Sequence, residues 1–320
     1  WSCDLITRRQ SLALTIAAPL LVRTGQTQAA SEAVWVLPSD TSWAYTEAAA
    51  ALQAEWKQVG RGRELVMLAA RELPTGAPPA ALVPLGTAAL RQTLERTASQ
   101  PDWARVPVLG ALLPRDGFTA IWKRPSPWVA AAFLDQPVER YLTLIRRAMP
   151  RLTKVGVLVH EDAPMQRQAL LKAAQDTGLR LVLGTVKGPD TLSASLRVVL
   201  NEADVLLILP DSTVADVSAV QHMLIMAYRQ RVPVVTYSPA LVKAGAALGL
   251  YASPAQAGRQ VATMLKGPMA QGMPSAAWPA SRVADGFTIA INEQVCRSLG
   301  LDVPDTAVLT DALRREEGMR

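Results

Sequence analysis

The chain has 320 residues, enough for one large or two medium-sized domains with hydrophobic cores. Half of the residues are hydrophobic, but no apolar run is long enough to cross a bilayer, so no permanent transmembrane helix is expected. The net charge of +6 comes from scattered basic residues without interleaved aromatics, which argues against a nucleic-acid partner. Two histidines and two distant cysteines show no metal-ligand spacing, and we expect neither a metal nor a cofactor.

The first thirty residues have the pattern of an export signal. Arg8 and Arg9 precede an uncharged stretch over residues 10–22, and small residues follow up to a plausible cleavage site near Ala29 or Ala30. The order Thr7-Arg8-Arg9-Gln10-Ser11-Leu12 resembles a twin-arginine signal, except that Ser11 stands where an aromatic residue is usual. The alternative is an amphipathic first helix of the fold. Removal of this segment would also leave Cys296 as the remaining thiol.

The following hundred residues alternate between short apolar runs and helical patterns. Such alternation is typical of a parallel sheet that is covered by helices on both faces. Strands are expected at residues 33–38, 65–69, 81–85 and 106–113, with helices at residues 41–59 and after Gly86. Residues 114–137 interrupt the pattern with prolines and tryptophans, and we interpret them as a passage between two lobes.

The alternation begins again after Pro137. Helices are expected at residues 137–149, 163–177, 191–201 and 254–266, and strands at residues 155–160, 179–186, 205–209, 232–237, 248–251 and 287–291. Of these, residues 205–209 form the most strongly apolar short run and predict a central, fully buried strand. A helix with an apolar stripe at Val214, Val217, Val220, Leu224 and Ala227 should follow it.

Two strand-to-helix turns are the candidate ligand site. Asp211, Ser212 and Thr213 should lie at the carboxyl end of the central strand, where open α/β sheets bind ligands. Gly86 and Thr87 occupy an equivalent turn in the first half of the chain. Backbone amides at such turns suit an anionic group, and Asp211 suits a ligand ammonium, although it is equally suited to cap a helix.

Aromatic side chains could complete the site by stacking on a flat ligand. Trp43, Trp128 and Tyr237 are candidates, with core or hinge packing as the alternative. An enzyme is not expected, because the chain has no nucleophile elbow, no dinucleotide fingerprint and no phosphate-binding loop. His160 lies beside Glu161 and Asp162, where a solvated loop explains it better than a catalytic base.

Eight segments of the chain carry a family pattern in their order and spacing: 85–89, 135–137, 149–150, 210–214, 242–246, 249–251, 257–260 and 289–304. Together they resemble the tryptophan/tyrosine-type substrate-binding proteins of ABC transporters. The resemblance covers roughly residues 80–305 and is best over residues 135–267. It implies a type I periplasmic-binding fold, a small-molecule ligand and ABC permease subunits as partners, with no stable membrane insertion after the signal is removed.

The departures from this family concentrate in the first half of the chain. Residues 38–43 and 112–116 differ from the family's usual polar segments, and Tyr251 stands where ligand-facing aromatic or polar residues are common. An amino-acid ligand therefore cannot simply be carried over. The alternative function is an accessory or sensory periplasmic protein of the same fold that acts through protein contacts.

We accordingly predict a periplasmic solute-binding protein that delivers an amino-acid-like or aromatic ligand to an ABC importer. Its expected organisation is an export signal (1–30), a first lobe (31–118 with 252–267), a second lobe (135–251 with 283–305), two crossings (119–134 and 268–282) and a tail (306–320). Hinge bending between the lobes should occur at residues 114–137, near Tyr251 and at residues 267–282.

Overall fold

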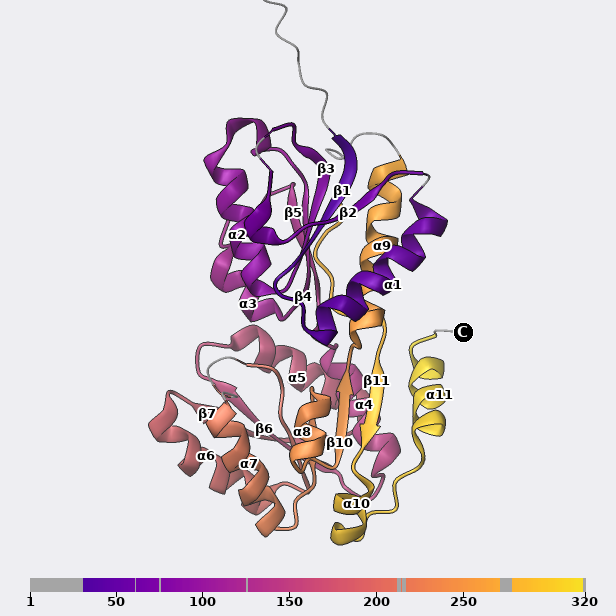
Figure 1. The fold of residues 1–320 in the computed structure, drawn as a ribbon. Coiled ribbons are helices and arrows are strands. Elements are labelled where there is room, and N and C mark those ends of the chain that lie inside the picture. Colours follow the sequence, from indigo (N-terminus) through magenta and orange to yellow (C-terminus); the bar gives the residue numbers. More distant parts are fainter. Residues whose placement is uncertain are drawn as a thin grey trace, which may run out of the picture.

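The computed structural model describes residues 31–318, apart from residues 61, 75, 125, 212, 213, 215, 216 and 271–277. The predicted export signal thus lies outside the described residues. Within them, strands and helices alternate and form two α/β lobes, one above the other in Figure 1. This architecture confirms the predicted fold class, two lobes that each contain a sheet between helices.

The first lobe is built on a five-stranded parallel sheet of order β2-β1-β3-β4-β5. Its strands are β1 (Ser31–Pro38), β2 (Leu65–Met67), β3 (Pro79–Leu85), β4 (Val108–Leu113) and β5 (Val129–Phe133). Its helices are α1 (Trp43–Val59), α2 (Thr87–Ser99), α3 (Arg115–Ile121) and α9 (Pro254–Ala270), with short 3₁₀ turns η1 (Ala70–Glu72) and η2 (Pro101–Trp103).

Helices α1 and α9 pack against each other on one face of this sheet, although about 200 positions separate them in the sequence (Figure 1). Their contact is closest at Gly258, where a Cβ would overlap the Ala48 carbonyl and lie 2.9 Å from the Leu52 amide nitrogen. Glycine is required here because the two helix backbones touch. The packing of α9 joins a segment from the second half of the chain to the first lobe.

The second lobe contains a six-stranded sheet of order β11-β10-β9-β8-β6-β7, parallel except for the antiparallel edge strand β11. Its strands are β6 (Lys154–His160), β7 (Arg180–Val186), β8 (Val205–Leu207), β9 (Val234–Thr236), β10 (Leu248–Tyr251) and β11 (Thr288–Ile291). Its helices are α4 (Val138–Ala148), α5 (Pro164–Thr177), α6 (Pro189–Glu202), α7 (Val217–Arg229), α8 (Pro239–Ala244), α10 (Glu293–Leu299) and α11 (Thr306–Glu316).

The predicted central strand is buried, but it is shorter than expected. β8 ends at Leu207, and α7 begins at Val217 rather than directly after the strand. Of the predicted helical stripe, Val220, Leu224 and Ala227 are buried, as is Val214 in the turn before the helix. Alternating strand residues face opposite layers, so Val205 and Leu207 join one core while Leu206 joins the other.

Residues 119–134 are not a crossing between the lobes, contrary to the sequence-based prediction. They complete α3 and form β5, which pairs with β4 and belongs to the first sheet. On its other side β5 is paired by Arg282, whose amide donates to the Ala131 carbonyl at 2.9 Å and whose carbonyl accepts from the Phe133 amide at 2.8 Å. The second predicted crossing, residues 268–282, thus also ends alongside the first sheet.

The expected tail contains a packed helix of the second lobe. Leu309 and Leu313 of α11 are buried against the core that α4 and β6 also form. Figure 1 shows α11, in yellow, running along the outside of this lobe beside β11. Residues 306–316 are therefore part of the fold, and only 317 and 318 follow the helix within the described range.

In the described residues the chain passes between the lobes near residues 134–137, 252–253 and 284–287. Glutamine side chains fasten these passages to one another: Gln136 Nε2 donates to the Gly286 carbonyl at 3.1 Å, and Gln260 Nε2 donates to the Val283 carbonyl at 2.8 Å. Gln256 Nε2 in turn donates to the Phe287 carbonyl at 2.8 Å. These hydrogen bonds join the passages to one another at the junction of the two lobes.

Among the described residues, no helix is both long and apolar enough to cross a bilayer.

Candidate functional site

A cavity of about 870 Å³ lies between the two lobes, where α3 of the first faces α5 of the second (Figure 1). Both lobes and one passage line it. Its lining residues with ionisable side chains are Arg115, Asp116, Asp135, Glu139, His160, Asp162 and Asp211. Its size suits a small organic molecule, since ligand pockets commonly measure about 300–1,000 Å³.

The topology of the second sheet explains why this space is lined by polar groups. β6 and β8 are parallel neighbours, so their carboxyl ends meet at the same edge of the sheet. His160 ends β6, and Asp211 follows β8 after a short extended segment. Ligands in open α/β folds bind at this edge because the strands end there and the following helices begin.

Asp211 lies in the cavity wall, and its carboxylate also holds the turn that follows. Oδ1 of Asp211 accepts a hydrogen bond from the Val214 amide at 2.9 Å. The side chain thus caps a turn three residues before α7, not α7 itself, which corrects the expected direct helix cap. The other two predicted residues of this turn, Ser212 and Thr213, lie outside the described residues.

Asp135 is a lining residue that the sequence-based prediction did not select. It lies in the passage from β5 to α4, and its Oδ2 accepts from the Arg115 amide at 2.8 Å. Burial raises the pKa of the Asp135 carboxyl, while the Arg115 amide and guanidinium oppose that increase. The motif Asp135-Gln136-Pro137 was a signal in the sequence, but nothing local indicated that its carboxylate would be buried in a cavity.

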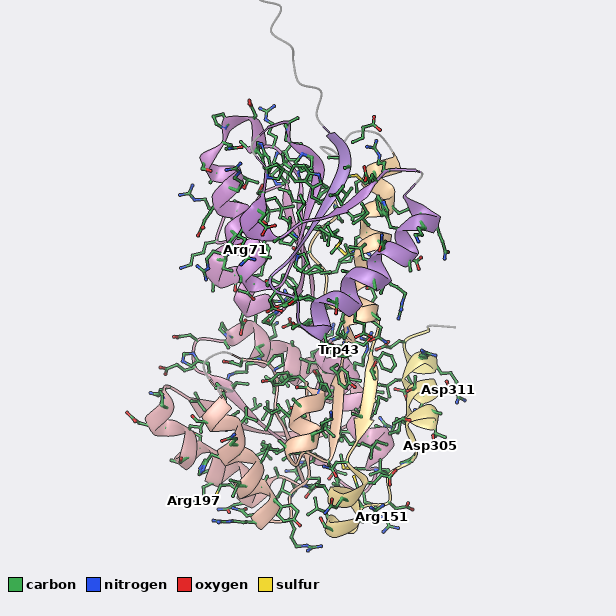
Figure 2. All side chains as sticks on the ribbon, viewed as in Figure 1. Trp43, Arg71, Arg151, Arg197, Asp305 and Asp311 are labelled. Carbon is green, nitrogen blue, oxygen red and sulfur yellow. The ribbon has the colours of Figure 1, made fainter. Side chains whose placement is uncertain are left out.

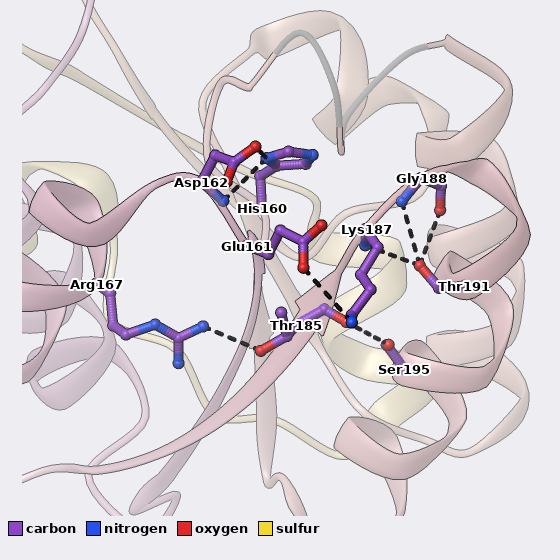
Figure 3. A network of polar contacts seen from close by, with 9 residues as sticks. All are labelled: His160, Glu161, Asp162, Arg167, Thr185, Lys187, Gly188, Thr191 and Ser195. Atoms are coloured by element: carbon purple, nitrogen blue, oxygen red, sulfur yellow. Dashed lines mark hydrogen bonds and ion pairs between the residues drawn. The ribbon is translucent and has the colours of Figure 1, made fainter.

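A network of polar contacts orders the loop after β6 (Figure 3). His160 Nδ1 accepts from the Asp162 amide at 3.2 Å, and Glu161 forms an ion pair with Lys187 at 3.6 Å. Arg167 donates to the Thr185 hydroxyl at 3.0 Å. The ring of His160 is thus held by its own loop, which supports the structural interpretation of this residue over the catalytic one.

The turn at Gly86 is occupied by protein groups. Gly86 has φ of 92°, and a Cβ there would lie 2.6 Å from the Ser39 hydroxyl and 2.5 Å from the Tyr45 hydroxyl. Ser39 Oγ accepts from the Ala89 amide at 2.9 Å and donates to the Leu85 carbonyl at 2.8 Å. One of the amides expected to bind an anion is therefore already satisfied by Ser39.

Thr87, Trp43, Tyr237 and Tyr251 occupy separate places around the junction of the two lobes. Thr87 begins α2, and its hydroxyl would lie 3.4 Å from a Cβ at Gly117 of α3. Trp43 begins α1, is 71% exposed, and lies at the end of the first lobe nearest the second (Figure 2). Tyr237 and Tyr251 follow β9 and end β10, and partial burial raises the pKa of both phenols.

Among the described residues, His, Cys, Asp and Glu side chains form no group of three that could hold a metal ion. Cys296 is a buried thiol in the core of the second lobe, and burial raises its pKa. The cavity lining itself offers carboxylates, one guanidinium, a histidine and helix amino termini.

Comparison with solved structures identifies proteins of the same two-lobed fold. A ligand-free, open structure of a substrate binding protein with adhesive properties from Clostridium difficile is 15% identical, with TM-score 0.59, covering 86% of this chain and 96% of that chain. The ABC domain in complex with L-Trp from Streptococcus pneumonia is also 15% identical, with TM-score 0.56 and coverages of 87% and 98%. A conserved domain protein from Vibrio cholerae is 20% identical, with TM-score 0.56 and coverages of 88% and 98%.

No curated protein sequence matches the chain. A family model described as ABC transporter substrate binding protein matches residues 103–314, about two thirds of the chain. This span includes α3, both passages around Asp135 and Tyr251, and the second lobe as far as residue 314, within α11. Together with the two lobes and their type I periplasmic-binding arrangement, the match shows that this chain belongs to the ABC transporter substrate-binding protein family.

Proposed function

We propose that this protein binds a small ligand between its lobes and delivers it to the permease subunits of an ABC importer. The observation that carries the proposal is the cavity of about 870 Å³ whose walls come from both lobes and from a passage between them. A ligand that touches both walls favours their approach, because its binding energy is larger when both lobes contact it.

The proposed ligand is amino-acid-like or aromatic. The amino termini of α4 and α5 line the cavity without side-chain caps, and their free amides suit a carboxylate. The carboxylates of Asp135 and Asp211 suit an ammonium group. Trp43, Tyr237 and Tyr251 would stack on a ring once the lobes close.

We also propose that the protein works outside the cytoplasm. Substrate-binding proteins of ABC importers are periplasmic or extracellular, and residues 1–30 carry the Arg8-Arg9 pattern of an export signal. Mass spectrometry of protein recovered from a Gram-negative periplasm should show a mature start near Ala30 or Ser31. An intact amino terminus in the cytoplasmic fraction would contradict this.

A second candidate function is an accessory or sensory role through protein contacts. It is favoured by one observation in the first lobe, where Ser39 and Tyr45 fill the turn at Gly86. A first lobe that satisfies its own amides offers fewer contacts to a ligand. This function requires the same two lobes but no closure around a small molecule.

Ligand screening combined with small-angle X-ray scattering separates the two functions. Protein lacking residues 1–30 is screened by thermal shift against amino acids, aromatic acids and nucleosides, and any ligand that raises the melting temperature is added at saturation. A transport protein should then show a smaller radius of gyration. An unchanged radius with saturating ligand would contradict a closing clamp and favour the sensory role.

A further inference from the structure

The charge of the cavity wall is opposite to the charge of the chain. Asp116, Asp135, Glu139, Asp162 and Asp211 contribute five carboxylates, whereas Arg115 contributes the one Lys or Arg side chain among the described lining residues. The whole chain carries a formal net charge of +6. The excess of negative charge is thus specific to this cavity and is not a property of the protein surface in general.

Part of this negative charge compensates helix dipoles. Asp116 and Glu139 lie in the first turns of α3 and α4, where acidic side chains are favourable. An α-helix amino terminus is equivalent to about half a positive charge, so α3, α4 and α5 together offset about one and a half carboxylates. Arg115 offsets another, which leaves the wall about two and a half charges negative.

Asp135 contributes part of the excess negative charge of the cavity wall. Its side chain is partly buried in the cavity wall, and its Oδ2 accepts from the Arg115 backbone amide. The Arg115 guanidinium lies over the Phe133 ring, 5.0 Å from its centroid, and only partly opposes the rise of the Asp135 pKa. A carboxylate in this position is stabilised by a nearby positive charge, because desolvation penalises its ionised form.

Asp211 supplies a second carboxylate, from the second lobe. Its Oδ1 is used by the Val214 amide, and that bond fixes the orientation of the carboxylate in the cavity. Asp135 belongs to the passage and Asp211 to the second lobe, while Asp116 approaches from α3 of the first lobe. Acidic groups therefore surround the space from both lobes.

We infer that the ligand is an organic cation, with at least one ammonium or guanidinium group in excess of its carboxylates. This inference rests on the proposed ligand-binding function and narrows its substrate class. The cavity defines the site, and its charge selects the ligand. The negative wall repels anionic ligands. It attracts cationic ligands, which strengthens their binding and raises their association rate.

The test is a charge series of similarly shaped probes, measured by isothermal titration calorimetry on protein lacking residues 1–30. L-Arginine, L-citrulline and L-glutamate differ in net charge, and 1,4-diaminobutane and succinate form a second series. The cationic member of each series should bind at least tenfold more tightly than the neutral or anionic members. Raising NaCl from 50 to 500 mM should weaken the cation's binding and leave that of L-citrulline nearly unchanged.

Variants connect the preference to the cavity. Asp135→Asn and Asp211→Asn keep the shape and the accepting oxygen, and each should weaken binding of the tightest cationic probe by about tenfold or more. Asp311→Asn is the matched control, because Asp311 is an exposed residue of α11 far from the cavity (Figure 2). It should leave affinity unchanged.

The outcomes separate this inference from the proposed function. Tighter binding of a neutral or anionic probe than of its cationic partner would overturn the cation assignment and leave ligand binding intact. Cation binding that is insensitive to both Asp→Asn variants would overturn it as well, because the cation would then bind elsewhere. If no amino acid, amine, aromatic acid, dicarboxylate or nucleoside bound at all, the proposed transport function itself would fail.

Discussion

Arg140 and Glu317 are 177 positions apart in the sequence and form a bidentate ion pair. Arg140 Nε donates to Glu317 Oε1 at 2.5 Å, and Nη2 donates to Oε2 at 3.0 Å. Arg140 also donates to Gln136 and to the Ala284 carbonyl, so one buried guanidinium joins the start of α4, the residue after α11 and the passage into β11. The carboxyl-terminal helix is thus connected to the passages between the lobes.

Replacing Glu317 by alanine should lower the free energy of unfolding by about 1.5–3 kcal/mol, the contribution of hydrogen bonds to a charged group. The cost is substantial because Arg140 is only 6% exposed and would lose its counter-charge. Denaturant unfolding of the full chain measures it. Glu316→Ala is the control: Glu316 pairs with Arg147, both are more than a third exposed, and its loss should cost under about 1 kcal/mol. Equal losses for the two variants would contradict the importance of burial here.

Asp135 should make stability depend on pH in the acidic range. Burial raises the pKa of its carboxyl in the folded protein, so between the unfolded value of about 3.9 and the raised value the folded state binds the proton more tightly. Raising the pH through this window therefore lowers the free energy of unfolding. Asp135→Asn should remove that contribution while its side-chain oxygen still accepts from the Arg115 amide.

The measurement is urea unfolding of both proteins between pH 3.5 and 6.5, with the difference between them plotted against pH. The native protein should lose stability relative to Asp135→Asn as the pH rises. A difference that stays constant, or one of the opposite sign, would show that Asp135 is not desolvated in the folded protein.

Two substitutions at Asp211 separate its turn contact from its charge. Asp211→Ala removes the acceptor of the Val214 amide and should cost about 1 kcal/mol of stability, together with a loss of ligand affinity. Asp211→Asn keeps an acceptor and should stay within about 0.5 kcal/mol of the native stability while affinity falls. Calorimetric melting and ligand titration on each variant give both quantities. Unchanged affinity in both would remove Asp211 from the ligand site.

Gly86→Ala should destabilise the first lobe by more than about 1 kcal/mol. The residue has φ of 92°, which disfavours a side chain, and a Cβ would meet the Tyr45 and Ser39 hydroxyls. Gly267→Ala in α9 is the control, because a Cβ there meets nothing within 4 Å. It should cause no loss of stability, since alanine is favoured over glycine in a helix. Thermal melting compares the two, and equal melting temperatures would contradict the crowding at Gly86.

The sequence alone determined the type of fold and most of its repeating elements. Apolar stripes mark a helix face wherever that face is buried, and the helix predicted over residues 137–149 is confirmed as α4, with Tyr141, Leu142 and Ile145 buried. The buried strand at residues 205–207 was predicted for the same reason, since a continuous apolar run indicates burial on both faces. These signals are local, so they predict a helix or a strand even when the elements that pack against it are unknown.

Other features were decided by tertiary contacts. β5 is a five-residue run, mostly alanine, between prolines, and only its pairing with β4 and Arg282 makes it a strand of the first sheet. α11 has just Leu309 and Leu313 on its buried face, too few to distinguish a packed helix from a charged tail. Turn chemistry also misled the prediction at Asp211, where the carboxylate caps a turn and α7 begins later.

The cavity shows the same division. Asp211 was found from sequence because it follows a buried strand, a relation between neighbours in the chain. Asp135 was not, because its burial depends on how the passage runs between two lobes whose residues are far apart in sequence. Periodicity records which face of an element is buried, whereas the charge of a shared cavity is a sum over distant segments, and only the folded arrangement brings those segments together.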